Sequence, residues 1–149
     1  MGINVQGVGH VVLKVRDLDR SAKFYREVIG LKEVARFPGQ MVFFSATGQN
    51  HHDLALLAVG PGAPGPQQEG VGLYHVALKI GDRLEDLRAA KEHLEAHGIT
   101  KIRVTDHRVS QSIYLNDPDG NGLELFVDAD PVIWRENPTA VATVEPLEL

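Results

Sequence analysis

The chain has no cysteine among its 149 residues, which excludes disulfide bonds and thiolate metal sites. Long hydrophobic runs are missing as well, because the longest apolar stretches, at residues 41–44 and 54–59, are only as long as strands. No apolar run follows a basic start. We therefore expect neither a secretory signal peptide nor a membrane span, and we expect a cytoplasmic protein.

Basic charge is also scarce. The chain carries 15 Lys and Arg residues against 20 Asp and Glu residues, for a formal net charge of −5. No segment forms a basic stripe, so we do not expect a nucleic-acid partner. The length is that of one domain, residues 1–149, and a chain of this size can bury a core without disulfide or metal cross-links.

A short sequence motif is present twice. His10 begins the sequence HVVLKV, and 65 residues later His75 begins the sequence HVALKI. In each copy the apolar residues alternate with the others, which is the pattern of a strand with one buried face. An internal repeat indicates that one structural unit is used twice. Each histidine starts its strand on the face opposite the core, so we expect the two imidazoles to meet.

The order of the remaining elements repeats too. In the first half, a helix that Asp17 or Asp19 can cap follows the first strand, and Gly30 lies near its end. Both halves are β-α-β-β-β in order, with a segment rich in glycine and proline between them. The expected strands are 31–37, 41–46 and 53–59 in the first half and 74–80, 102–104, 112–115 and 123–127 in the second, whose helix starts at about residue 83. We expect module 1 at about 5–59, a linker at 60–70, module 2 at about 71–128 and an irregular tail at 129–149.

Glu124 is a carboxylate in the middle of the last strand. Leu123, Leu125 and Val127 alternate with it, so Glu124 projects to the face that carries the histidines. A carboxylate between apolar neighbours is costly when it is buried without a partner. A metal ion is one such partner.

Two segments resemble the vicinal oxygen chelate superfamily, which includes glyoxalase I, epimerases, fosfomycin-resistance transferases, bleomycin-binding proteins and extradiol dioxygenases. Residues 9–31 resemble its first module, and residues 117–126, with the sequence DPDGNGLELF, resemble the end of a second module. The resemblance covers the chain up to Val127. It implies an α+β fold of two tandem βαβββ modules that form a cup-shaped mixed sheet, with helices outside and a metal at the base.

A narrower resemblance is to extradiol ring-cleaving dioxygenases. It rests on the pattern from Thr105 to Glu124, T-x-H-x5-I-Y-x2-D-P-x-G-x3-E, and on residues 50–55, which are similar to the segment that carries the acid/base histidine of that family. Many members have four modules, whereas this chain has two. Carried over by position, the metal ligands are His10, His75 and Glu124, the acid/base residue is His52, and His107 and Tyr114 flank the substrate.

This ligand set suits one chemistry in particular. Two histidines and one carboxylate are the triad of non-haem Fe(II) oxygenases, and the triad leaves open positions for both oxygens of a catechol and for O2. The leading hypothesis is therefore an Fe(II)-dependent extradiol dioxygenase with a catechol-type substrate. Mn(II), Zn(II) and Ni(II) are alternative metals.

Other members of the superfamily are alternatives. A fosfomycin-resistance-like transferase would use the same ligands, and a glyoxalase-like lyase or isomerase would need a fourth ligand, which Asp53 could supply. The sequence leaves open whether His51, His52 or Asp53 faces the metal. His107 and Tyr114 favour the dioxygenase, and the intact ligand set argues against a non-catalytic, bleomycin-resistance-like binder. Because each module leaves an open sheet edge, we expect a homodimer, with the site formed in one chain or across a swapped pair.

Overall fold

The computed structural model describes residues 2–149 and divides into two compact units, the first ending at Gly65 and the second running Pro66–Leu149. The boundary falls inside the expected linker. Each unit has its own sheet. The expected β-α-β-β-β order is confirmed in both units, and the fold is α+β.

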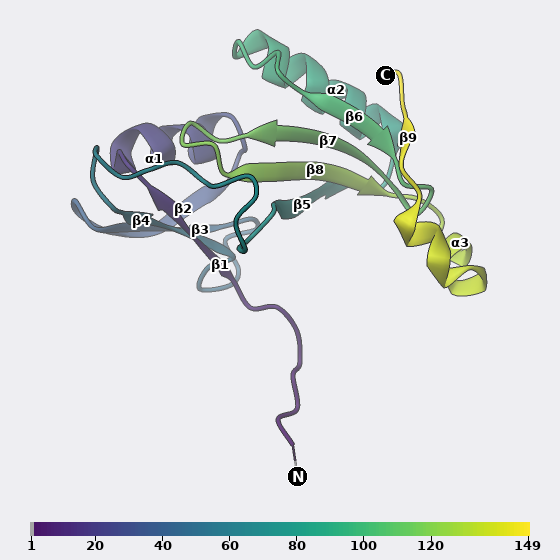
Figure 1. Cartoon of the computed structure of the whole chain (residues 1–149), viewed down its shortest axis with the longest axis horizontal. Helices are drawn as coiled ribbons and strands as arrows, with labels where there is room; N and C mark the ends of the chain where they lie inside the picture. The colour runs from purple at the N-terminus through teal and green to yellow at the C-terminus, as the bar shows by residue number, and fades with distance from the viewer. Residues whose placement is uncertain (1) are drawn as a thin grey trace. The chain divides into compact units, whose positions relative to one another are not determined.

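The first unit places one helix on a four-stranded sheet. Its sheet has the strand order β1-β4-β3-β2, in which β1 and β4 are parallel and the other neighbours antiparallel. Figure 1 shows α1 lying along this sheet. The side chains of Tyr25 and Phe44 are fully buried between the two, with ring centroids 6.2 Å apart. The elements are β1 (Val11–Val15), α1 (Leu18–Glu27), β2 (Lys32–Phe37), β3 (Met41–Ser45) and β4 (Leu54–Ala58).

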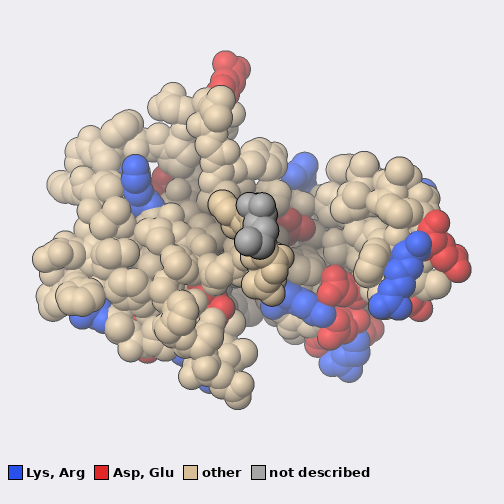
Figure 2. All heavy atoms as spheres, turned by 90° about the horizontal axis from the view of Figure 1, so that it is seen from below, with Lys and Arg blue, Asp and Glu red and all other residues tan. Residues whose placement is uncertain are grey.

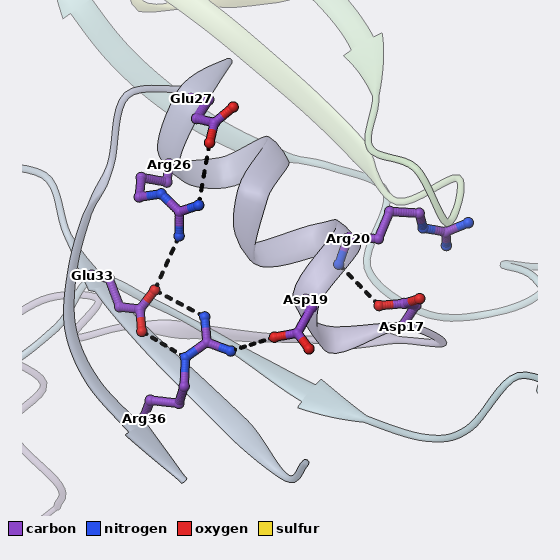
Figure 3. Close-up of polar contacts among 7 residues, drawn as sticks. All are labelled: Asp17, Asp19, Arg20, Arg26, Glu27, Glu33 and Arg36. Atoms are coloured by element: carbon purple, nitrogen blue, oxygen red, sulfur yellow. Dashed lines mark hydrogen bonds and ion pairs between the residues drawn. The ribbon is translucent and has the colours of Figure 1, made fainter. Parts of the chain in front are cut away.

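Charged side chains hold α1 and β2 together (Figure 3). Asp17 is the N-cap of α1, since its Oδ1 accepts a hydrogen bond of 2.9 Å from the backbone N–H of Arg20. On β2, the guanidinium of Arg36 donates to both carboxylate oxygens of Glu33, at 2.7 and 3.0 Å, and to Asp19 of α1 at 2.6 Å. The hydrogen bonds from Arg36 lower the pKa of Glu33. The charged form of this cluster therefore stabilises the unit.

The second unit repeats the scheme with one more strand. Its sheet has the order β5-β8-β7-β6-β9, with β5 and β8 parallel. Figure 1 shows α2 over one face of this sheet, and Leu87 and Leu94 are the helix residues buried there. The elements are β5 (Val76–Gly81), α2 (Leu84–Ala96), β6 (Arg103–Asp106), β7 (Ser110–Asn116), β8 (Gly122–Asp128), α3 (Val132–Glu136), η1 (Pro138–Ala142) and β9 (Glu145–Pro146).

A tight turn sets the register of β7 and β8. Gly120 has a φ of +91°, as the sequence of the turn predicts, and its N–H donates to the carbonyl of Asp117 at 3.1 Å. The Asp117 carboxylate accepts from the backbone N–H groups of Asp119 and Asn121, at 2.8 and 2.9 Å. This closure places Tyr114 of β7 directly opposite Glu124 of β8.

The tail differs from the irregular extension that we expected. It forms α3, η1 and β9, and β9 pairs antiparallel with β6 through Thr105 and Asp106. Ala140 of η1 is buried, and the Arg108 guanidinium binds the Glu145 carboxylate at 3.1 Å. A strand of two residues has no hydrophobic period of its own. It exists because the edge of β6 offers it backbone partners, which a local pattern does not reveal.

Charges of the two signs are interspersed. On the face shown in Figure 2, Lys and Arg side chains lie beside Asp and Glu side chains. Charges of both signs also meet at Lys79, whose Nζ lies 2.6 Å from Asp82 and 2.8 Å from Asp128. Among the described residues, no helix combines the length and the apolarity that crossing a membrane requires.

Candidate functional site

The centre of the candidate site in the second unit is a nearly buried carboxylate. The Glu124 side chain is 10% exposed, and its Oε2 lies 2.9 Å from Nε2 of His75. Its Oε1 accepts a hydrogen bond of 2.5 Å from the Ser112 hydroxyl. Both carboxylate oxygens thus have a polar partner, which offsets much of the cost of taking the charge out of water.

A glycine allows His75 to approach this carboxylate. Gly122 opens β8, and a Cβ at this position would lie 2.6 Å from the carbonyl oxygen of Tyr74 and 3.2 Å from Cβ of His75. Any side chain here would push the segment before β5 away from β8. Gly122 therefore keeps His75 within reach of Glu124.

His75 and Glu124 fit a divalent metal ion as ligands. The Nδ1 atom of His75 is buried and has no hydrogen-bond partner among residues 2–149, so the polar contact of the ring is made through Nε2. Its Nε2 faces the carboxylate. Imidazole nitrogen and carboxylate oxygen are the donors that Fe, Mn, Zn and Ni accept.

Tyr114 and His107 form a hydrogen-bonded chain on the same face of the sheet. The Tyr114 hydroxyl lies 2.8 Å from Nε2 of His107, and Nδ1 of His107 lies 2.7 Å from the carbonyl oxygen of Thr143. A carbonyl can only accept, so Nδ1 carries the hydrogen and donates it. In the neutral imidazole Nε2 is then an acceptor, and it receives the Tyr114 O–H. The tail carbonyl thus selects the tautomer of His107.

Tyr114 is held in its protonated form. Burial, and then the neighbouring Glu124 carboxylate, raise the pKa of Tyr114 to about 12. Arg103 lies on β6, the neighbouring strand, and its guanidinium is 4.5 Å from the centre of the Tyr114 ring. At neutral pH the Tyr114 hydroxyl is therefore a hydrogen-bond donor.

In the first unit, His10 and His52 come together. Their ring centroids are 4.2 Å apart, and the His51 ring is farther from His10, at 6.4 Å. The Phe43 ring makes a T-shaped contact with His52, with ring centroids 5.2 Å apart. Burial, and then the neighbouring imidazoles of His10 and His51, lower the pKa of His52. At neutral pH the His52 ring is uncharged and can accept a proton.

The Asp53 side chain makes hydrogen bonds within its own loop. Its carboxylate accepts hydrogen bonds from the backbone N–H of Ala46 at 2.7 Å and from the Asn50 side-chain amide at 2.5 Å. These bonds, that from Ala46 foremost, lower the pKa of Asp53. The side chain closes the loop between β3 and β4. Of residues 51–53, His52 is the one that lies against His10.

The structure thus brings the expected residues together in two groups. His75, Glu124, Tyr114 and His107 lie together in the second unit, and His10 and His52 lie together in the first. Within each unit, no three His, Asp or Glu side chains of residues 2–149 form a cluster that could hold a metal ion. The meeting of His10 with His75 and Glu124 stays a prediction.

Three polar groups of the second unit were absent from the sequence hypothesis. Ser112 precedes Tyr114 by two residues on β7, so the alternation of a strand could have placed its hydroxyl on the face of Glu124. Arg103 depends on the register of β6 against β7. The Thr143 carbonyl belongs to the backbone, and no residue type signals it.

Comparison with known proteins gives a consistent result. The family model described as the glyoxalase/bleomycin resistance protein/dioxygenase superfamily matches residues 7–125. Catechol-2,3-dioxygenase of Bacillus subtilis (strain 168) is 37% identical over 131 residues, which cover 87% of this chain and 44% of that protein. Biphenyl-2,3-diol 1,2-dioxygenase 2 of Rhodococcus globerulus is 34% identical over 120 residues, covering 80% of this chain and 61% of that protein. The chain therefore spans only about half the length of these two relatives.

Solved structures share the fold. The crystal structure of lactoylglutathione lyase from Agrobacterium tumefaciens has a TM-score of 0.60 and 28% sequence identity, and the match covers 83% of this chain and 94% of that one. A fosfomycin resistance protein, FosX from Listeria monocytogenes, has a TM-score of 0.63 at 22% identity, covering 89% of this chain and 99% of that one. The second similarity concerns the fold alone.

Proposed function

Because the chain belongs to the glyoxalase/bleomycin resistance protein/dioxygenase superfamily, we propose that it is an Fe(II)-dependent extradiol dioxygenase that opens a catechol-type ring. The observation that carries the proposal is the polar array on one sheet face of the second unit, where Glu124 and His75 lie beside Tyr114 and His107. Two relatives named as diol dioxygenases support it.

The proposed metal ligands are His10, His75 and Glu124. When bound, the metal would supply positive charge that favours the ionised diol and open positions for its two oxygens and for O2. The chain contributes a negative carboxylate that Ser112 holds in place, and an imidazole that Gly122 lets approach that carboxylate. Both ligands in the second unit are thus oriented by their neighbours before any metal binds.

His52 is the proposed base. The step assigned to it is removal of a proton from one hydroxyl of the diol, and the same proton can return to the product when the ring opens. An imidazole whose pKa lies below its usual range is uncharged at neutral pH and ready to accept. The neighbouring rings of His10 and His51 favour this neutral form, since each added charge would repel another.

Tyr114 is the proposed donor to a substrate oxygen. Its hydroxyl stays protonated at neutral pH. Without substrate its one hydrogen goes to Nε2 of His107, so donation to a substrate oxygen requires the O–H to turn away from Nε2. A hydroxyl that points at the place where negative charge develops stabilises that charge. Nδ1 of His107 is committed to the Thr143 carbonyl, so Nε2 is the ring atom that faces the Tyr114 hydroxyl.

A reconstitution experiment tests the proposal. The metal-free protein is loaded with Fe(II) under argon, catechol is added, and air is admitted while O2 and visible absorbance are recorded. We expect O2 uptake together with a yellow ring-cleavage product, and neither signal from protein loaded with Zn(II). Tight binding of Zn(II) or Ni(II), with no O2 uptake after Fe(II) loading, would overturn the proposal.

Asp53 separates this function from the glyoxalase-like alternative. That alternative needs a fourth protein ligand, and the sequence offered Asp53 for the role. The Asp53 carboxylate is instead engaged by the Ala46 N–H and the Asn50 amide. A ligand set without Asp53 supports the three-ligand site of the dioxygenase.

A further inference from the structure

The C-terminal tail reaches the candidate site through its backbone. Figure 1 shows the tail running from α3 back to β6, where β9 forms the outer edge of the sheet. Just before β9, the carbonyl oxygen of Thr143 accepts the Nδ1 hydrogen of His107 at 2.7 Å. The bond joins residues 36 positions apart in the sequence, so it exists only while the tail lies along this edge.

Backbone pairing secures β9 on β6. The paired residues are Thr105 with Pro146 and Asp106 with Glu145. Proline has no N–H, and successive pairs of an antiparallel ladder alternate between exchanging hydrogen bonds and not doing so, so the exchanging pair is Asp106 with Glu145. The Glu145 carboxylate adds an exposed ion pair with Arg108, 3.1 Å long, which contributes little in water. Attachment of the tail therefore depends on the N–H of Glu145 more than on its side chain.

The Tyr114 hydroxyl has two acceptors within reach. Nε2 of His107 lies 2.8 Å away. The Glu124 carboxylate is opposite Tyr114 in the pairing of β7 with β8 and is also within hydrogen-bond reach of the hydroxyl. A phenol has one hydrogen to donate, so it serves one of these acceptors at a time. While Thr143 keeps the imidazole hydrogen on Nδ1, Nε2 is an acceptor and takes the Tyr114 hydrogen.

Release of the tail reverses this arrangement. Without the Thr143 carbonyl, Nδ1 of His107 loses its acceptor, and the imidazole of histidine in water favours hydrogen on Nε2. Nε2 then donates to the Tyr114 oxygen, and the Tyr114 hydrogen turns to Glu124. The carboxylate lone pair that accepts this hydrogen is no longer available to a metal ion, so Glu124 holds the metal more weakly.

We propose that the tail is a positioning element of the site, and that Glu145, through its backbone N–H, is the positioning residue. The attached tail directs the Tyr114 hydroxyl to His107 and leaves Glu124 to the metal. The coupling to the metal rests on the proposed function, whereas the change at His107 needs no metal. Because linked equilibria are reciprocal, a metal bound at Glu124 also holds the tail on β6.

A matched pair of variants at position 145 tests the change at His107. Glu145→Pro removes the N–H that pairs with β6, and Glu145→Ala removes only the exposed carboxylate. NMR of protein with 15N-labelled histidine, recorded at pH 8 without metal, shows which ring nitrogen carries the hydrogen. We expect Nδ1 in the wild type and in Glu145→Ala, and Nε2 in Glu145→Pro. The same tautomer in all three proteins would overturn the proposal, and so would hydrogen on Nε2 in the wild type.

Metal affinity tests the coupling to Glu124. In calorimetric titrations under argon, we expect Glu145→Pro to bind Fe(II) about tenfold more weakly than the wild type and Glu145→Ala. In a Tyr114→Phe background the same substitution should have no effect, because the hydroxyl that carries the coupling is gone. An effect that persists in Tyr114→Phe would overturn the coupling. A wild type that binds no metal would overturn the proposed function and the coupling together, and the His107 tautomers would still decide the role of the tail.

Discussion

The two units use the same scaffold with different chemistry at one equivalent position. In the second unit Ala77 of β5 pairs with Glu124 of β8, and in the first unit Val12 of β1 pairs with Ala55 of β4. Val12 and Ala77 each lie two residues after the repeated histidine. Ala55 is therefore the counterpart of Glu124, and it is fully buried.

This difference shows what the repeat contributed. It reproduced the strand that starts with histidine and the parallel strand beside it, but only one copy carries a carboxylate in that parallel strand. In the first unit His10 is exposed and lies beside His52 instead. The first unit thus brings imidazoles together, and the second unit brings an imidazole against a nearly buried carboxylate.

The largest effect on metal binding and activity is expected when the second unit loses the carboxylate that the first unit lacks. Glu124→Gln removes the charge and keeps the shape, so we expect metal affinity to fall by more than about 100-fold and ring cleavage to be lost. Calorimetric titration with Fe(II) under argon measures the affinity. The control is Glu92→Gln on the exposed side of α2, which should leave affinity and activity at wild-type levels. An E124Q protein that binds the metal normally would remove Glu124 from the site.

The next effect concerns the first unit. His52→Ala deletes the proposed base but none of the proposed ligands, so we expect kcat to fall by about 10²- to 10⁴-fold with metal content unchanged. His93→Ala on the exposed side of α2 is the control and should leave both quantities at wild-type levels. Metal analysis of the purified variants, beside steady-state O2 uptake, gives both quantities. Loss of metal from H52A would reassign His52 as a ligand.

A smaller effect is expected at Asp53, the residue that a glyoxalase-like site would require. Asp53→Ala deletes the acceptor of the Ala46 N–H, and we expect the free energy of unfolding to fall by about 1–2 kcal/mol with metal affinity unchanged. Urea unfolding and metal titration measure the two. Asn50→Ala, which removes the amide donor to Asp53, is the control for the loop. A D53A protein that loses its metal would favour the glyoxalase-like alternative.

The smallest effect is expected in the charge cluster between α1 and β2. Glu33→Gln should lower the free energy of unfolding by about 1 kcal/mol at pH 7, because the paired carboxylate is partly exposed. The pKa of Glu33 is lowered in the folded state. The contribution of Glu33 to stability is therefore fully present above the pKa of this group in the unfolded chain. It is lost as the pH falls through the pKa of the group in the folded protein.

Urea unfolding at pH 7 and at pH 3 checks this prediction. The difference in the free energy of unfolding between the wild type and Glu33→Gln should be smaller at pH 3 than at pH 7. Glu27→Gln serves as the control, since Glu27 contacts the exposed Lys23 and Arg26 and should have little effect at either pH. A difference that is the same at both pH values would show that the charge of Glu33 contributes nothing.

The sequence predicted the order of strands and helices in each unit because the signals for them are local. Alternation marked β1 and β8, and Gly120 marked the turn. Asp17 and Asp19 were both candidates for the cap of α1, and the cap is Asp17. Strands β6 and β7 extend further than expected, since Thr105, Asp106, Ser110 and Gln111 are polar and belong to these strands through backbone pairing. Strand β5 starts at Val76, two residues later than expected.

The candidate site was predictable to the extent that side chains identify it. Glu124 stands out as a carboxylate between apolar residues, and the repeat marks His10 and His75. The choice among His51, His52 and Asp53 was not predictable, because the loop between β3 and β4 has no period. The hydrogen bonds of Asp53 to Ala46 and Asn50 orient this loop, and which of the three residues faces the metal stays a prediction.

The bond between His107 and the Thr143 carbonyl has a consequence for how this site can change over generations. Every amino acid at position 143 offers the same oxygen, so replacing that side chain leaves the bond in place. The bond is lost only if the tail takes a different path, for instance if β9 detaches from β6. Selection on this bond therefore acts on the course of the main chain, and the residue type at position 143 can change.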